Sequence, residues 1–137
     1  MRKFDNYCSN LAVLEKAYKE DIQNEFIVSG IIDKFSIQFE LGWKVLKEFI
    51  LYEGSSIGKT GSPRAIIKEA YHIFDFMDET IWLHMLKDRN DTSHIYDGNL
   101  AKELAARILK EYIPEFVSTR ENLFRRYKDI VGEKQFD

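Results

Sequence analysis

The chain has 137 residues, which is enough for one domain with a sizeable core, and its 45% hydrophobic and 31% charged residues are typical of a globular protein. Its net charge of −3 excludes an overall basic surface for nucleic acid, so any contact with RNA must be local. The single cysteine, Cys8, excludes an internal disulfide, no spacing is typical of a zinc site, and no apolar run approaches the roughly 20 residues of a membrane span.

Two long helices are predicted in the first part of the chain. Apolar residues at intervals of three and four predict a helix over about Lys3 to Ile22. In the second helix, a strict 4-3 spacing typical of a bundle seam runs through Val28, Ile32, Phe35, Phe39, Gly42, Leu46 and Phe49. Gly42 would let another helix approach closely, although a packing role is the more common one for such a glycine. The glycine-rich segment 54–61 breaks the pattern.

Capping residues mark the starts of the next two helices. Ser62 and Pro63 are typical of an N-cap and first helical residue, which predicts a third helix from Pro63 to about Phe74. Asp78 is expected to cap a fourth helix that carries Trp82 and continues towards the turn at 97–99.

The last predicted helix uses apolar residues from Leu104 to Ile130, and Pro114 should kink or split it. No alternation typical of β-strands stands out. We therefore expect an all-α fold, an antiparallel up-and-down bundle of four to five helices that forms one domain over residues 1–137.

The segment from Arg89 to Tyr96 contains the candidate functional residues. Arg89 supplies a forked cation suited to phosphate, His94 a proton carrier near neutral pH, and Tyr96 a hydroxyl. On a continuous helix at about 100° per residue, Arg89, Ser93 and Tyr96 extend the apolar stripe, and His94 lies near the edge of a groove. Structural roles are the alternative, because Arg89 could pair with Glu40 or Asp91, His94 could be a surface residue at a helix end, and Tyr96 could belong to the core.

Several stretches together resemble a known family. They are Arg89-x-x-x-x-His94-x-Tyr96, Trp82-x-x-Met85-Leu86, Phe39-Glu40-Leu41-x-Trp43-Lys44, and Ser62-Pro63-Arg64 followed by Ile67-Lys68-Glu69-Ala70. The chain resembles the HEPN superfamily, in the branch of nucleotidyltransferase substrate-binding proteins and HepT-like toxins. The resemblance implies a HEPN-like helical homodimer whose partner is a small nucleotidyltransferase.

Two functions follow from this resemblance. In the first, the chain is the toxin of a toxin–antitoxin pair, a metal-independent endoribonuclease with a composite site at the dimer interface. The transferase is then the antitoxin and places AMP on the motif tyrosine. In the second, the chain is a non-catalytic subunit that binds substrate or nucleotide for the transferase. A helical dimerisation protein without a site is the third, plainer alternative.

We expect Arg89 and His94 as catalytic residues, Tyr96 as a modification acceptor or phosphate ligand, and Asn90 and Ser93 as supporting residues. Acid–base chemistry favours the ribonuclease, because RNA carries its own 2′-hydroxyl nucleophile and a two-fold dimer would supply two histidines and two arginines. The acidic balance of the chain favours the binding subunit instead. No metal or other cofactor is expected, RNA is a candidate ligand, and the expected location is the cytoplasm.

Overall fold

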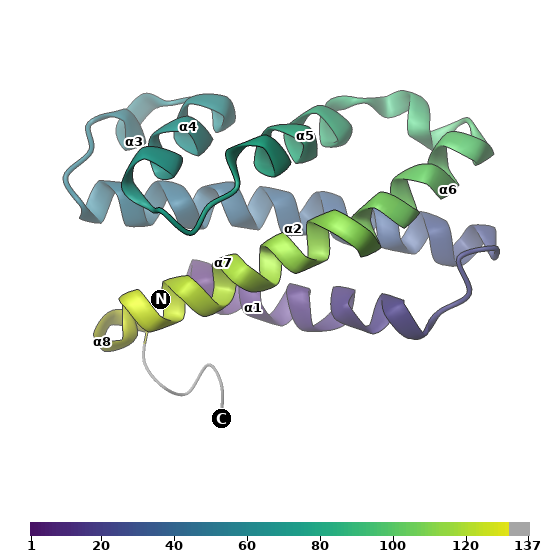
Figure 1. The fold of residues 1–137 in the computed structure, drawn as a ribbon, viewed down its shortest axis with the longest axis horizontal. Helices are drawn as coiled ribbons and strands as arrows, with labels where there is room; N and C mark the ends of the chain where they lie inside the picture. Colours follow the sequence, from purple (N-terminus) through teal and green to yellow (C-terminus); the bar gives the residue numbers. More distant parts are fainter. Residues whose placement is uncertain (132–137) are drawn as a thin grey trace.

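A computed structural model describes residues 1–131, and every regular element in that range is helical, which confirms the expected all-α bundle. The helices α1 (Arg2–Glu15), α2 (Glu25–Tyr52) and α5 (Glu79–Asn90), and the joined path of α6 (Gly98–Arg107) and α7 (Ile113–Arg126), run along one long axis in alternating directions (Figure 1). The short helices α3 (Ile57–Thr60), α4 (Pro63–Ile73) and α8 (Lys128–Val131) lie at one end. Residues 132–137 of the expected domain lie outside the described residues.

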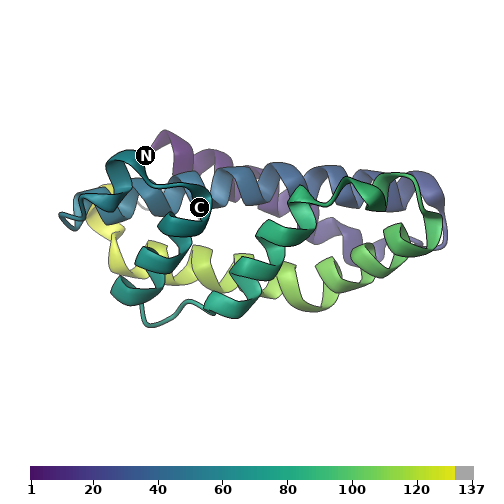
Figure 2. The ribbon, with the colours of Figure 1, turned by 90° about the horizontal axis from the view of Figure 1, so that it is seen from above.

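The long helix α2 is the central element, and it packs against α1, α4, α5 and α6 (Figure 2). Its N-cap, Asn24, accepts hydrogen bonds from two backbone N–H groups of the first turn. At 1.5 Å per residue, its 28 residues span about 42 Å. The expected seam faces the core, with only Ile32 partly exposed and the other members buried: Val28, Phe35, Phe39, Gly42, Leu46 and Phe49.

The predicted starts of α4 and α5 are confirmed by their caps. The side chain of Ser62 accepts a hydrogen bond from the backbone N–H of Ala65 at 3.2 Å, and that of Asp78 accepts one from Ile81 at 3.1 Å. Each bond satisfies one N–H of the first helical turn, which has no partner within the helix. These local bonds explain why both helices begin where the sequence indicates.

Close packing at Gly42 involves a side chain and not a second helix backbone. A Cβ atom at this position would lie 2.8 Å from Cη2 of the buried Trp82. The indole ring meets Phe116 edge-on, with 5.5 Å between ring centroids, and its Nε1 donates to Glu115 at 3.0 Å. Glu115 also accepts from the backbone N–H of Asp78 at 3.0 Å, so it ties α7 to the start of α5. Burial raises the pKa of Glu115 despite these bonds.

The first helix is shorter than expected. It ends at Glu15, and Lys16–Lys19 form a tighter 3₁₀ turn, η1, so Ile22 lies outside the helix. This turn leaves the ring of Tyr18 largely exposed while its hydroxyl donates to the carbonyl of Leu109 near the start of the last long helical path.

The interruption expected near Pro114 is a π-helical turn, η3 (Ile108–Tyr112), between α6 and α7. Here the N–H of Ile113 bonds to the carbonyl of Ile108, five residues back. The same register would pair the carbonyl of Leu109 with residue 114, but proline has no N–H. The hydroxyl of Tyr18 supplies the missing donor. Pro114 therefore splits the regular helix without ending the helical path.

Candidate functional site

The fourth helix ends before the motif does. α5 stops at Asn90, and Asp91 accepts hydrogen bonds from the backbone N–H of Ser93 at 3.0 Å and from its hydroxyl at 2.7 Å. These local bonds favour a turn over continued helix, and Thr92–Ile95 form the 3₁₀ turn η2. The expected continuous stripe from Trp82 to Tyr96 is therefore wrong beyond Arg89.

Arg89 faces α2. Its Nη2 lies 3.1 Å from Oε2 of Glu40, and its guanidinium lies 5.3 Å from the ring centroid of Phe39. The Nε atom is buried and has no hydrogen-bond partner, although the side chain as a whole is 29% exposed. The pairing with Glu40, one of the structural alternatives, is thus present.

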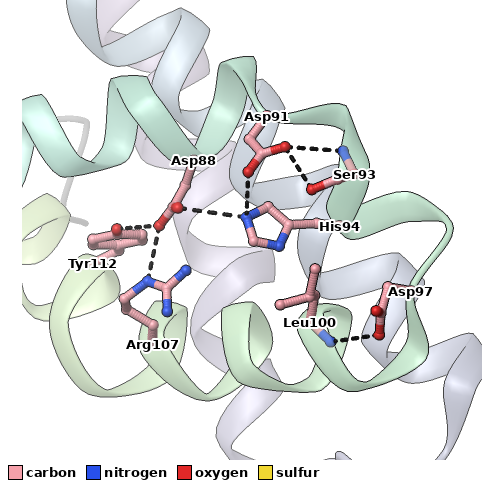
Figure 3. Close-up of polar contacts among 8 residues, drawn as sticks. All are labelled: Asp88, Asp91, Ser93, His94, Asp97, Leu100, Arg107 and Tyr112. Carbon is pink, nitrogen blue, oxygen red and sulfur yellow. Dashed lines mark hydrogen bonds and ion pairs between the residues drawn. The ribbon is translucent and has the colours of Figure 1, made fainter.

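His94 is buried, with 7% of its surface exposed, so its expected place at a groove edge is wrong. Its Nε2 lies 3.5 Å from Oδ1 of Asp88 and 3.6 Å from Oδ2 of Asp91 (Figure 3). Its Nδ1 is buried without a hydrogen-bond partner. His94 points inwards because η2 places its imidazole against Asp88 in the last turn of α5.

Asp88 is the centre of a polar cluster that also contains His94. It accepts hydrogen bonds from Nε of Arg107, at 2.9 Å, and from the hydroxyl of Tyr112 (Figure 3). Partial burial raises the pKa of Asp88, but the bonds from Arg107 and Tyr112 outweigh it, and the pKa lies below its ordinary value. Burial and the bond to Asp88 raise the pKa of Tyr112, so the phenol stays protonated and acts as the donor. The cluster joins α5, η2, α6 and η3.

Sequence reasoning missed Asp88, Arg107 and Tyr112 as neighbours of the motif. On a regular α-helix, Arg107 and Tyr112 would point about 140° apart. The π-helical turn between them brings both side chains to one carboxylate. The signal that could have indicated this arrangement is Pro114, which follows Arg107 and Tyr112, a charged and an aromatic residue five positions apart.

Tyr96 does not lie beside Arg89 as expected, because it follows η2 and its side chain is 88% exposed. Its neighbour Ile95 is 67% exposed, and Phe26 at the start of α2 is 81% exposed. These three residues border a groove of about 590 Å³ that also reaches Gln23 and Lys102. The hydroxyl of Tyr96 is therefore available to a partner, and both apolar and polar side chains line the groove beside it.

Within one chain the motif residues are not brought together. Arg89 contacts residues of α2, His94 lies near two carboxylates, and no hydrogen bond or ring contact among residues 1–131 joins these two side chains. Ser93 shapes the turn through Asp91, whereas Asn90 lines a second groove together with Arg89. Of the two expected supporting residues, only Asn90 thus shares a surface with the arginine.

Two general properties complete the site. No group of three or more His, Cys, Asp and Glu side chains within residues 1–131 is arranged to hold a metal ion. None of the helices in the same range combines the length and the hydropathy needed to cross a membrane.

Comparison with known proteins gives one match. The family described as "Nucleotidyltransferase substrate binding protein like" matches residues 2–125, which include the whole of α1 to α6 and nearly all of α7. No curated protein matches the chain.

Proposed function

Because the chain belongs to the family of nucleotidyltransferase substrate-binding-like proteins, we propose that it is the non-catalytic subunit of a two-component nucleotidyltransferase and presents Tyr96 to its partner. The observation that carries this proposal is the 88% exposure of Tyr96 at the border of a groove. Tyr96 is the most exposed tyrosine of the described residues. Tyr7 and Tyr112 are unsuited, since Tyr7 is buried and donates to the carbonyl of Phe116, and Tyr112 donates to Asp88.

The proposed chemistry is transfer of a nucleotidyl group to the phenol. The oxygen of Tyr96 attacks the α-phosphorus of ATP held by the transferase, and an O–P bond forms while the bond between the α-phosphorus and the bridging oxygen breaks. Pyrophosphate leaves, and the phenolic proton passes to solvent. The product carries a bulky anion beside the exposed apolar side chains of Phe26 and Ile95, so it would alter what this face can bind.

The test uses a candidate partner nucleotidyltransferase, ATP and magnesium, with intact-mass spectrometry as the readout. We expect the wild-type chain to gain at least one adenylyl group and Tyr96→Phe to gain none. Tyr52→Phe is the matched control, because Tyr52 is also well exposed, at 66%, but lies at the end of α2. Undiminished modification of folded Tyr96→Phe would contradict the assignment.

A second candidate function is the metal-independent endoribonuclease of a HEPN-like toxin, neutralised by the same transferase. It is favoured by the position of His94, whose Nε2 lies 3.5 Å from Oδ1 of Asp88 and 3.6 Å from Oδ2 of Asp91, since neighbouring carboxylates can orient an imidazole for proton transfer. Because Arg89 and His94 do not meet within one chain, the reaction would need a homodimer, and the exposed side chains of Phe26, Ile95 and Tyr96 offer a contact surface for a second copy. The RNA 2′-hydroxyl would attack the adjacent phosphorus and expel the 5′-oxygen, leaving a 2′,3′-cyclic phosphate.

This candidate predicts RNA cleavage by the chain alone in the presence of a chelator. His94→Ala should slow it by about 100-fold or more, the usual contribution of a general acid or base. His84→Ala serves as the control because His84 is an exposed residue of α5. Cleavage at the wild-type rate by a folded His94→Ala protein, or a strictly monomeric state in sedimentation, would argue against the ribonuclease.

A further inference from the structure

A second groove lies where the start of α4 meets the end of α5, which pack side by side (Figures 1 and 2). It has a volume of about 480 Å³. Leu83 and Leu86 form an apolar part of its wall. Its polar lining consists of Ser62, Arg64, Lys87, Arg89 and Asn90.

Positive charge is concentrated in this groove although the chain is acidic overall. Arg64 and Lys87 are exposed, and neither forms an ion pair with any residue of the described range. Arg89 has one acidic partner, Glu40, which is shared with Lys44 at 3.5 Å. Three cations therefore line one cavity, and two of them, Arg64 and Lys87, form no ion pair within the described part of the protein, although Lys87 also interacts electrostatically with Asp91.

The fold itself accounts for only part of this arrangement. Lys87 and Arg89 occupy the last turn of α5, where the helix dipole favours cations. Arg64 has the opposite setting: it lies in the first turn of α4, where the dipole is positive, and no acidic residue accompanies it there. The position of Arg64 is unfavourable for the helix alone and favourable if an anion occupies the groove.

From this geometry we infer that Arg64, Lys87 and Arg89 form a binding groove for the phosphate groups of a nucleotide or of an RNA strand. One guanidinium group can donate two parallel hydrogen bonds to two oxygens of a phosphate, and the ammonium group of Lys87 adds a mobile point charge. The amide of Asn90 and the hydroxyl of Ser62 can donate further hydrogen bonds, because the cap of α4 uses only the oxygen of Ser62 as an acceptor. This inference is independent of Tyr96, which borders the other groove.

The experiment measures binding to the full chain of three separate probes: a labelled short single-stranded RNA, ATP, and inorganic pyrophosphate. The test variant is Arg64→Gln/Lys87→Gln. Its matched control is Lys19→Gln/Lys68→Gln, which removes the same charge from exposed positions outside the groove. Circular dichroism of each variant establishes that it is folded.

We expect the groove variant to bind RNA or ATP at least about tenfold more weakly, because two charge-assisted hydrogen bonds to phosphate are removed, and the control to change little. With RNA, the slope of log affinity against log salt should also fall by about 1.4, since each phosphate that the protein no longer neutralises accounts for roughly 0.7 of the slope. Groove-dependent binding of RNA alone identifies a strand as the source of the phosphates, and groove-dependent binding of ATP or pyrophosphate identifies a free nucleotide.

Equal weakening in the groove variant and the control, or no binding of any probe by the wild-type chain, would overturn the inference. Tyr96→Phe should bind these probes as the wild type does. If the wild-type chain binds the probes in the groove but gains no nucleotidyl group at Tyr96, the proposed function alone is refuted. If it gains the group at Tyr96 but shows no groove-dependent binding, the groove alone is refuted.

Discussion

Replacing Trp82 with alanine should lower the free energy of unfolding by about 4 kcal/mol, within the usual range for a buried tryptophan. The indole is fully buried and packs against Gly42, where the Cβ atom of any larger residue would collide with it. Its removal opens a cavity between α2, α5 and α7, and it also deprives Glu115 of the hydrogen bond that Nε1 of Trp82 donates. Glu115 then keeps one hydrogen-bond donor, the backbone N–H of Asp78. Its burial disfavours the charged carboxylate, so the lost bond is not easily replaced.

Urea unfolding followed by circular dichroism measures this loss, and Trp82→Phe separates its two causes. Phenylalanine fills part of the cavity but has no N–H, so Trp82→Phe should fall between the wild type and Trp82→Ala. Because burial raises the pKa of Glu115 above its ordinary 4.5, this group favours folding in acid and opposes it once the pH rises through the raised pKa. A loss below about 1 kcal/mol in Trp82→Ala would contradict the packing described for Gly42.

Replacing Asp88 with asparagine should cost about 2 kcal/mol near neutral pH, because Arg107, Tyr112 and His94 lose their shared carboxylate. The expected loss in the free energy of unfolding is no larger because the side chain of Arg107 is 32% exposed, so water can replace part of the lost interaction. The variant also tests acid stability. The folded-state pKa of Asp88 is lowered from 3.8, so its contribution is present above that value and is lost as the pH falls through the folded pKa.

The measurement is the free energy of unfolding near pH 7 and near pH 3. We expect the gap between wild type and Asp88→Asn to be large at the first pH and to shrink at the second. Asp75→Asn is the matched control, since Asp75 is exposed and has no hydrogen bond or ion pair within the described range. A gap that stays constant across this pH range would exclude the proposed linkage.

Most of the fold could be predicted from the sequence, because it depends on repeated or local patterns. The apolar spacing of α2 repeats over many residues, and a stripe of apolar side chains on one helix face is buried in the core. The starts of α4 and α5 depend on single caps, Ser62 and Asp78, whose side chains bond within three residues. The apolar pattern did not predict the end of α1, because the residues of η1 suit either kind of helix.

The candidate site was less predictable because one local turn changes every direction after it. The pattern of residue types identified Arg89, His94 and Tyr96, but their placement assumed a regular helix. The Asp91 side chain bonds to Ser93 and ends that helix, so His94 is buried and Tyr96 is exposed, the reverse of the expectation. The partners of His94 come from distant positions, and no spacing within the motif contains that information.

The bond between Tyr18 and the carbonyl of Leu109 makes two sequence positions interdependent. Pro114 removes a backbone donor, and Tyr18, from a different part of the chain, replaces it. A lineage that lost the proline would regain an N–H and no longer need the hydroxyl, while one that lost only the hydroxyl would leave a carbonyl without a partner. We therefore expect the two positions to vary together among related sequences, with the tyrosine changing more freely where the proline is absent.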